Sequence, residues 1–283
     1  MSEAQVFKQD CRQGIPRRVR NGSVNLAFAD PPYNIGQDYA DYHDKKSHDE
    51  YMAFSREWMS KVKDALHKHG AFWLAINDDW VSELDMVARN ELKLYRRSWV
   101  TWYYTFGQAN KRNFARCKTN LLYFVKTKSK HTFNMDDPKV RVPSARQLKY
   151  KDKRANNKGK LPDDVWMVIP EQCPKDAFDA THDVWLYSRV CGTFKAKHND
   201  SPNQMPVQML DRIVRLCSNA GDLVMDPFVG TGTTGHAAVK GSRRFIGFDI
   251  SPACIRTTRK RMKEAKVEAD IEADQARTLF DGI

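Results

Sequence analysis

Residues 223–249 read LVMDPFVGTGTTGHAAVKGSRRFIGFD, and this stretch decides the fold. An apolar strand leads into Gly230, Gly232 and Gly235, which have G-x-G-x-x-G spacing, and a helical segment and a second apolar strand follow. Glycines allow the backbone to approach a ligand closely. Asp249 lies about 20 residues after the first glycine, where an acid typically accepts ribose hydroxyls. The stretch predicts a βαβ unit that binds an adenosine-containing cofactor; the alternative is a turn that only packs a helix against a sheet.

A second apolar run, Val24–Ala29, leads into Asp30-Pro31-Pro32-Tyr33. Two prolines neither extend a strand nor freely start a helix, so the chain leaves the sheet in a rigid turn. The turn places a carboxylate, a backbone carbonyl and an aromatic ring at the carboxyl edge of a sheet, where open α/β sheets bind ligands. Acceptors beside a flat ring suit a planar base with an exocyclic amine. The alternative is a plain turn in which Asp30 caps and Tyr33 packs.

Together the two motifs resemble those of the amino-group DNA methyltransferases, which methylate adenine N6 or cytosine N4. The motif at 30–33 precedes the cofactor loop at 226–234, and this order resembles the beta group of that family. The resemblance extends from around Val6 to Met262. It implies a Rossmann-like α/β fold with helices on both faces of the sheet, S-adenosylmethionine as cofactor, double-stranded DNA as partner and no metal. The group contains homodimers, and no feature of this sequence decides the oligomeric state.

The resemblance also implies which residues hold the cofactor. Asp249 matches the ribose-binding acid, and Asp10 lies where the group places an adenine-contacting acid. Residues 201–206 read SPNQMP where the group often has His-Pro-Thr-Gln-Lys-Pro, so Met205 replaces a lysine. This segment is implied to contact the methionine half of the cofactor. The implied cofactor residues are Asp10, Gln204, Pro206, Asp226, Phe228, Gly230, Gly232, Thr233 and Asp249.

The implied chemistry explains the tetrapeptide. An exocyclic amine is a poor nucleophile because its lone pair is delocalised into the ring. Asp30 and the Pro31 carbonyl would each accept one N–H and so favour a pyramidal nitrogen, and methyl transfer would be an in-line displacement. The base would leave the duplex and stack on Tyr33. Methylation at cytosine carbon 5 is excluded, because it needs a cysteine that usually follows a proline and the chain has no Pro-Cys pair.

Composition narrows the class of protein. The 283 residues are 41% hydrophobic with a mean hydropathy of −0.67, and no apolar run approaches the 18 or more residues of a membrane span. The first thirty residues have no apolar signal core. The six cysteines form no C-x-x-C pair, which favours reduced thiols in a cytoplasm. A net charge of +12 and a pI of about 9.4 favour a polyanionic partner.

The rest of the chain alternates strand and helix patterns, which predicts a mainly parallel sheet with crossover helices. Gly70 is expected to end the first long helix, and the residues after Val267 are expected to be loosely ordered. Trp102 or Tyr104 is a candidate wall of the target-base pocket, although core packing explains both equally well. The expected elements are helices at 49–68, 80–90, 207–218, about 233–240 and 252–266, and further strands at 71–76, 98–105 and 120–126.

One segment breaks the alternation. Residues 139–160 are strongly basic, and Asp152 is the only acid among them. Such a run favours contact with DNA, and the alternative is a solvated face. We therefore expect a catalytic half at 1–126, an inserted target-recognition region at 127–197, a cofactor half at 198–266 and a tail at 267–283. The expected DNA contacts are Lys149, Lys151, Lys153 and Arg154.

The leading hypothesis is a DNA methyltransferase acting on adenine N6, because Asp rather than Ser at position 30 favours adenine. The nearest alternative is the same enzyme acting on cytosine N4. A nicotinamide-dependent oxidoreductase would use the glycines but leave Asp30–Tyr33 and the basic run unexplained. A non-catalytic DNA-binding relative would not need the intact motifs.

Overall fold

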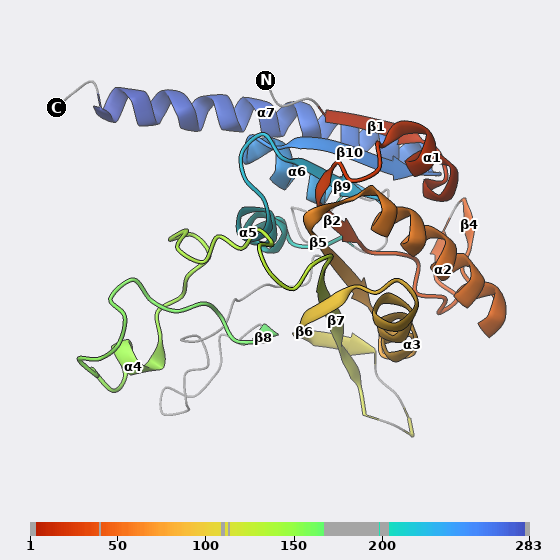
Figure 1. Cartoon of the computed structure of the whole chain (residues 1–283), viewed down its shortest axis with the longest axis horizontal. Coiled ribbons are helices and arrows are strands. Elements are labelled where there is room, and N and C mark those ends of the chain that lie inside the picture. Colours follow the sequence, from red (N-terminus) through yellow and green to blue (C-terminus); the bar gives the residue numbers. More distant parts are fainter. Residues whose placement is uncertain are drawn as a thin grey trace.

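A central β-sheet organises the chain. The computed structural model describes residues 4–39, 41–108, 111–112, 114–166, 198 and 204–280. Within these residues the main sheet has the strand order β1-β10-β9-β2-β5-β7-β6-β8 (Figure 1). Its strands are β1 (Ala4–Lys8), β2 (Val24–Ala29), β5 (Leu66–Ile76), β6 (Tyr95–Gln108), β7 (Arg116–Val125), β8 (Val165–Trp166), β9 (Leu223–Asp226) and β10 (Arg244–Asp249). A separate hairpin pairs β3 (Asp38–Tyr39) with β4 (Tyr42–His43).

Most neighbouring strands are parallel, as the alternating pattern predicts. The five strands from β1 to β5 in the sheet order run parallel, and β7 is antiparallel to both β5 and β6. At the centre, Leu26 and Ala27 of β2 pair with Val224 and Met225 of β9. The Asn25 side chain also accepts a hydrogen bond of 3.1 Å from the backbone N–H of Leu223, which is 198 residues away in the sequence. The two sequence motifs therefore end neighbouring strands at one edge of the sheet.

Helices cover both faces of the sheet (Figure 1). Along β2 the side chains alternate between two cores, with Leu26 and Phe28 in one and Ala27 and Ala29 in the other. The first core includes residues of α5, α6 and α7, and the second includes residues of α1, α2 and α3. The helices are α1 (Cys11–Arg18), α2 (His48–Ala65), α3 (Val81–Met86) continued by the π-helix η1 (Val87–Glu91), α4 (Ala145–Leu148), α5 (Val207–Cys217), α6 (Thr233–Lys240) and α7 (Pro252–Phe280).

Gly70 does not end a helix, as the sequence suggested, but lies inside β5. Helix α2 already ends at Ala65, and β5 begins at Leu66. The register against β2 shifts between Val24, which pairs with Leu66, and Leu26, which pairs with Ala71. A Cβ on Gly70 would lie 2.8 Å from the Val24 carbonyl oxygen. The glycine therefore permits a close backbone approach at an irregularity of the sheet.

The chain after Val267 is helical rather than loosely ordered, because α7 continues to Phe280. The added residues are rich in good helix formers such as alanine and glutamate. Glu268 ties the extension to α6, with its carboxylate 3.4 Å from Nε2 of His236 and 3.0 Å from Nζ of Lys240. Within the described residues, no helix is both long and apolar enough to cross a membrane.

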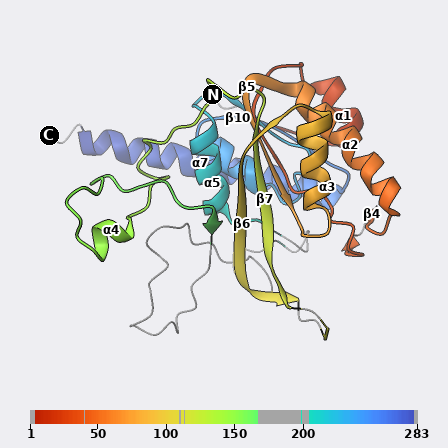
Figure 2. The same ribbon diagram turned by 60° about the horizontal axis from the view of Figure 1, so that its bottom comes forward.

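The first part of the expected insertion contains little regular structure. Residues 127–166 hold α4, the short β8 and an isolated bridge between Val142 and Lys160, and they project from the body as a loop (Figure 2). Val140 and Val142 nevertheless belong to the main core. Asn134 donates from Nδ2 to the carbonyls of Arg215 and Ser218 at the end of α5. The base of the loop is thus anchored to the domain. Residues 167–197 of the expected target-recognition region lie outside the described residues.

Candidate active site

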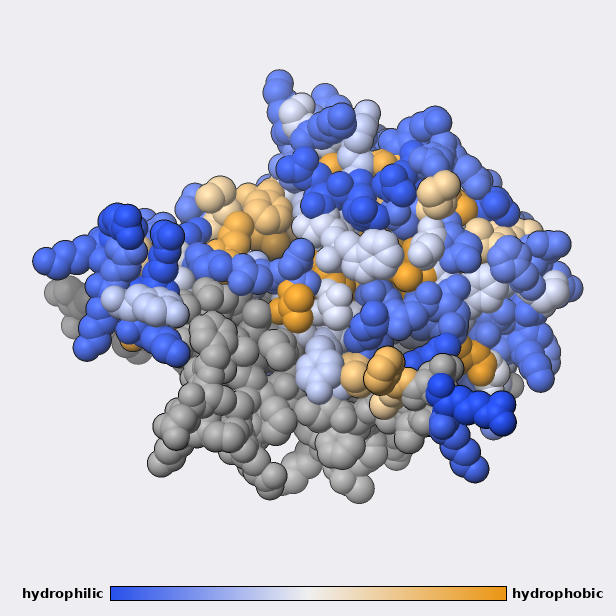
Figure 3. All heavy atoms as spheres, turned by 90° about the horizontal axis from the view of Figure 1, so that it is seen from below, coloured by the Kyte–Doolittle hydropathy of each residue, from blue (hydrophilic) through white to orange (hydrophobic). Residues whose placement is uncertain are grey.

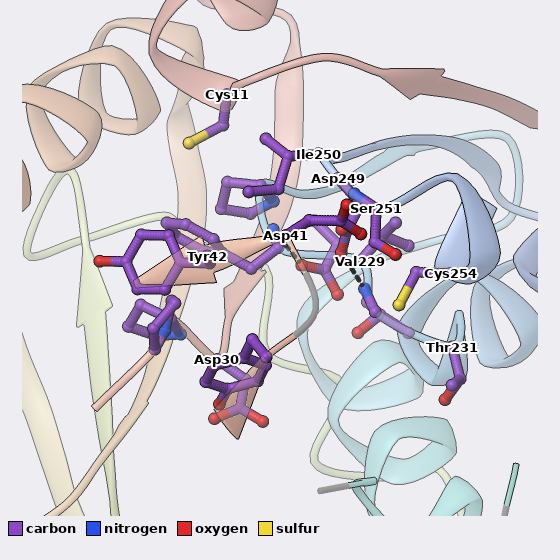
Figure 4. Close-up of a pocket in the computed structure, with 18 of the residues that line it drawn as sticks. Cys11, Asp30, Asp41, Tyr42, Val229, Thr231, Asp249, Ile250, Ser251 and Cys254 are labelled. Carbon is purple, nitrogen blue, oxygen red and sulfur yellow. Dashed lines mark hydrogen bonds between the residues drawn. The ribbon is translucent and has the colours of Figure 1, made fainter. Parts of the chain in front are cut away.

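A cavity of about 440 Å³ lies at the carboxyl ends of β2, β9 and β10 (Figure 4). Asp30, Asp226 and Asp249, which end or follow these three strands, all line it. The catalytic tetrapeptide and the cofactor loop therefore open into one space. This is the juxtaposition that the two sequence motifs predict, and it follows from the adjacency of β2 and β9 at the centre of the sheet.

The Asp30 carboxylate is held by a side chain. Oδ1 accepts a hydrogen bond of 2.7 Å from the Tyr33 hydroxyl. Burial raises the pKa of Asp30 to about 6, and the Tyr33 bond opposes that rise. The Pro32 carbonyl accepts the Tyr51 hydroxyl at 2.6 Å, so α2 fixes the Pro-Pro turn. Pro31 and Tyr33 line the cavity beside the carboxylate.

The loop after the tetrapeptide folds around Asp44, which the sequence analysis did not single out. Its carboxylate is 3% exposed and accepts backbone N–H groups of Asn34, Ile35 and Gln37 at 2.8, 3.1 and 3.0 Å. Asn34 has a φ of +55°, a conformation that asparagine tolerates better than most residues. Asn34 also exchanges two hydrogen bonds with the backbone of Lys46. Asp44 thus fixes the backbone directly after Tyr33.

The Asp249 carboxylate is held by the backbone. Oδ2 accepts the N–H of Gly230 at 2.9 Å, and Oδ1 accepts the N–H of Ser251 at 2.8 Å. Burial raises its pKa, against the effect of these bonds. Gly230 has a φ of +49°, and a Cβ there would lie no closer than 4.0 Å to any neighbouring atom. The glycine therefore supports a left-handed turn and leaves room above the loop.

Asp226 is the most buried of the three acids, at 4% exposure. It accepts the N–H of Phe228 at 2.9 Å. Burial raises the pKa of Asp226 to about 7, and the nearby charges of Asp30 and Asp249 add to the rise. Three carboxyl groups thus lie at neighbouring strand ends, and burial with their mutual repulsion keeps Asp226 partly protonated at neutral pH.

Asp10 reaches the cavity from the other side of β10. Strand β1 runs beside β10, with Lys8 paired to Asp249, and the N–H of Gln9 donates to the Asp249 carbonyl at 2.8 Å. Asp10 caps α1 through the N–H of Arg12 and also pairs with the Arg12 guanidinium at 2.7 Å. Burial raises the pKa of Asp10, but the bonds and charge of Arg12 outweigh this and lower it overall.

Two of the expected cofactor residues, Gly232 and Pro206, do not line the cavity. A Cβ on Gly232 would lie 2.8 Å from the Thr258 side chain on α7, and the residue has a φ of +85°. A side chain there would disturb the packing of α6 on α7 rather than enter the cofactor space. Pro206 is buried at the start of α5. The other expected cofactor residues line the cavity: Asp10, Gln204, Asp226, Phe228, Gly230, Thr233 and Asp249.

The β3–β4 hairpin supplies cavity residues that the sequence analysis missed. Asp38, Tyr39, Asp41 and Tyr42 all line the cavity, and Figure 4 shows Asp41 between Tyr42 and the loop residue Val229. The cluster of acids and tyrosines just after the tetrapeptide is the sequence pattern that could have predicted these cavity residues. Trp102 and Tyr104, the proposed pocket walls, instead belong to or pack against the main core and do not line the cavity. Trp102 is buried in the core and Tyr104 is only partly buried, but Tyr104 lies close enough to the tetrapeptide to help raise the pKa of Tyr33.

Among the described residues, every charged side chain in the cavity wall is acidic, and these are Asp10, Asp30, Asp38, Asp41, Asp226 and Asp249. The described residues contain no group of three or more His, Cys, Asp or Glu arranged to hold a metal. A wall of this kind suits a cationic ligand with hydroxyl groups. S-adenosylmethionine, with its sulfonium and ribose, fits these acceptors and the space above Gly230.

The expected DNA-contacting cations lie on the projecting loop, away from the cavity wall. Lys149, Lys151 and Lys153 are exposed, and the exposed Arg154 pairs with Asp152 at 3.0 Å. Seen from below in Figure 3, the loop forms a mostly hydrophilic lobe at the left of the molecule. The structure does not bring these four residues to the reacting groups, which is expected of residues that would contact phosphates.

The family is shown by comparison with known proteins. The family model for N6/N4 DNA methylases matches residues 24–260. The chain belongs to this family. The chain is therefore an S-adenosylmethionine-dependent DNA methyltransferase, which confirms the resemblance seen in the two motifs.

Among curated relatives, the type II methyltransferase M1.MboII of Moraxella bovis is 33% identical over 83% of this chain and 87% of its own length. M.HpaI of Haemophilus parainfluenzae is 31% identical, with 87% of this chain and 70% of that enzyme covered. The DNA adenine methyltransferase YhdJ of Escherichia coli is 28% identical, with coverage of 88% and 79%.

Solved structures share the fold of this methyltransferase. The M1.HpyAVI–SAM complex matches with a TM-score of 0.58 and 19% identity, over 92% of this chain and 98% of that one. The PvuII DNA methyltransferase, described as cytosine-N4-specific, matches with a TM-score of 0.63 and 14% identity, over 95% and 92%. At such low identity these matches establish the fold alone.

Proposed function

We propose that this methyltransferase methylates the N6 amine of adenine in double-stranded DNA. The observation that carries the proposal is the carboxylate of Asp30 at the first position of the tetrapeptide, placed in the same cavity as the cofactor loop. A carboxylate oxygen accepts an amine N–H more strongly than a neutral hydroxyl does. The similarity to the Escherichia coli adenine methyltransferase supports the same substrate.

The geometry supports a role for each residue of the tetrapeptide. Oδ1 of Asp30 accepts the Tyr33 hydroxyl, and Oδ2 would accept one N–H of the target amine. The Pro31 carbonyl would accept the other, which leaves the nitrogen lone pair directed at the cofactor. Tyr33 would stack on the flipped base, and Pro32 would hold the turn through its bond to Tyr51. The bound cofactor supplies a methyl group on a positively charged sulfur.

The Asp30 carboxylate could also accept the proton that the amine loses on methylation. A carboxyl with a pKa of about 6 is mostly ionised at neutral pH and can still take up a proton transiently at Oδ2. Asp249 and Asp10 would bind the adenosine part of the cofactor, and Phe228, Gly230 and Thr233 would complete the walls of the whole cofactor site.

Nucleoside analysis tests the substrate. The protein is incubated with unmethylated DNA and labelled S-adenosylmethionine, the DNA is digested, and the nucleosides are identified by mass spectrometry. We expect label only in N6-methyladenine, and none with Asp30→Ala. Label only in N4-methylcytosine would overturn the adenine assignment and leave the mechanism intact. Label in neither base, with the cofactor bound, would count against DNA as substrate and favour RNA.

We further propose that DNA lies across the edge of the sheet that carries the cavity. The β6–β7 hairpin extends past this edge, because Ile76 at the end of β5 pairs with Asn120, well inside β7 (Figure 2). Near its tip Lys111 is exposed and Phe114 is 97% exposed. The hairpin and the basic loop after residue 127 would then both contact the duplex. This arrangement agrees with the proposed division into a catalytic half, an inserted target-recognition region and a cofactor half.

The basic loop is tested by salt titration of DNA binding. A variant with alanine at Lys149, Lys151, Lys153 and Arg154 should bind all sequences more weakly. The slope of log affinity against log salt should flatten by about 0.9 for each removed cation that had neutralised a phosphate. The matched control removes four exposed cations of α7, Arg256, Lys260, Lys263 and Lys266, and should keep the wild-type slope. Equal slopes in all three proteins would mean that the loop is only a solvated face.

A further inference from the structure

A guanidinium is buried directly behind the cofactor loop. Arg261 of α7 is 4% exposed, and its Nη1 donates to the Thr231 carbonyl at 2.8 Å and to Oγ1 of Thr233 at 3.2 Å. A longer bond of 3.4 Å reaches Oγ1 of Thr231. Burial lowers the pKa of Arg261 to about 10, so the side chain still carries its charge at neutral pH. The positively charged guanidinium thus donates these hydrogen bonds to uncharged oxygens of Thr231 and Thr233.

Among the side chains that the structure describes, no acid forms an ion pair with this guanidinium. None of their carboxylate oxygens lies within 4.0 Å of its nitrogens. The two nearest acids along α7, Glu264 and Glu268, favour the charged form of Arg261 from a longer distance. Their close ion pairs are with other cations, since Glu264 pairs with Lys260 and Glu268 with His236 and Lys240. A buried charge without a close partner is costly. The arrangement is therefore suited to an anionic group that arrives with a ligand.

The threonines that contact Arg261 are cavity residues. Thr231 and Thr233 both line the cavity, and Oγ1 of Thr231 lies 3.4 Å from Oε1 of Gln204. In Figure 4, Thr231 lies on the opposite side of the drawn residues from Cys11 and Tyr42. Met205, next to Gln204, is uncharged, and the charged groups of the wall are all acids in the part of the chain that the structure describes. Helix α6 also begins at Thr233, which adds the positive end of a helix dipole.

We propose that Arg261 is a positioning residue that binds the amino-acid carboxylate end of S-adenosylmethionine through Thr231 and Thr233. The carboxylate is the one anionic group of the cofactor, and an otherwise acidic cavity would repel it everywhere else. The buried guanidinium supplies the countercharge, and the threonine hydroxyls supply the direct hydrogen bonds. The adenosine end then points toward Asp249 and Asp10. The inference concerns cofactor binding and is independent of which base is methylated.

Binding of three ligands to the full-length protein tests this role. The ligands are S-adenosylmethionine, its decarboxylated analogue and adenosine, measured by titration calorimetry. In Arg261→Gln the preference for the carboxylate-bearing ligand over the decarboxylated one should fall by at least about ten-fold, as expected for loss of a nearby charge in a partly buried site. Adenosine should bind as in the wild type. Arg261→Lys should keep most of the preference, because it keeps the charge.

Controls separate this role from a structural one. Arg259→Gln changes an exposed arginine of the same helix that donates to the Val6 carbonyl, and it should keep the full preference. If Arg261→Gln weakens all three ligands by one factor, Arg261 only supports the loop and the proposal is wrong. If Arg261→Gln does not fold, the proposal is tested with the double variant Thr231→Val, Thr233→Val. This variant keeps the charge of Arg261 and removes the two hydroxyls, so it should lose the preference for the carboxylate-bearing ligand. An unchanged preference in that variant would also overturn the proposal.

Discussion

The ends of β10 and β2 hold their carboxylates in different ways. At the end of β10, both oxygens of Asp249 accept backbone N–H groups, from Gly230 and Ser251. After the end of β2, Asp30 accepts a side-chain hydroxyl from Tyr33, which itself lines the cavity. Backbone bonds are set when the chain folds, whereas a side chain can rotate when a substrate arrives. Asp249 is therefore fixed before a ligand arrives, whereas Asp30 is held by a side chain that can move.

The largest effect should come from Asp30→Asn, which keeps the shape and removes the charge. Methyl transfer should fall by at least about 10²–10³-fold, as for other losses of a preorganised electrostatic group, and cofactor affinity should persist. Transfer of a radiolabelled methyl group measures the activity, and calorimetry measures the cofactor affinity. A variant with near wild-type activity would contradict the role of the carboxylate.

The same variant should be more stable than the wild type at high pH. The folded-state pKa of Asp30, about 6, lies above the ordinary value of 3.8, so the folded protein binds the proton more tightly than the unfolded chain does. Wild-type stability therefore falls as pH rises from about 4 to about 6. Above that range Asp30→Asn should gain about 1–3 kcal/mol, a gain that vanishes below pH 4. Thermal unfolding at pH 8 and pH 4 measures the difference.

Asp249→Ala tests the other strand end. The Gly230 and Ser251 N–H groups lose their acceptor and the ribose loses its partner, so cofactor binding should weaken by about 1–3 kcal/mol. DNA binding without cofactor should not change, because the loss is confined to the cofactor side. Calorimetry and a DNA titration measure the two affinities. Cofactor binding of wild-type strength would remove Asp249 from the site.

Asp44→Asn tests whether the loop after β2 needs its internal acceptor. One oxygen becomes an NH2 group that faces backbone donors, so the loop after Tyr33 should be less well placed. We expect kcat to fall by about ten-fold, equivalent to roughly 1.4 kcal/mol, with the cofactor Kd unchanged. Asp49→Asn, at an exposed acid of α2, is the matched control. An equal loss in the control, or a loss confined to cofactor affinity, would contradict a local role for Asp44.

Tyr33→Phe should have the smallest effect, because it keeps the ring and removes only the hydroxyl. The rate should stay within about ten-fold of the wild type, the cost of one hydrogen bond. Since the Tyr33 bond lowers the pKa of Asp30, its loss should raise that pKa. The wild-type rate should fall as pH drops below about 6, and the variant should begin to fall at a higher pH. An unshifted pH profile would show that Tyr33 does not influence Asp30.

Local signals explain what the sequence could predict. Strand β2 and helix α6 occupy the expected residues. Their signals, an apolar run, two prolines and spaced glycines, determine the backbone conformation of residues only a few positions away. Asp44 and Arg261 were missed because each acts on backbone or side chains of another segment, brought near only by the fold. Gly70 and Gly232 were misread for the same reason, since their constraints are the Val24 carbonyl and the Thr258 side chain.

The pairing of β2 with β9 has a consequence for how the protein is made. Strand β2, which leads into Asp30, leaves the ribosome early, and its central partner β9 follows roughly two hundred residues later, as the Asn25–Leu223 bond illustrates. Contacts so distant in sequence form slowly, and until β9 arrives one side of β2 has unpaired backbone groups. During synthesis the nascent amino-terminal half therefore has an exposed strand edge. We expect this half to depend on chaperones, and the site to form only when the last strands are complete.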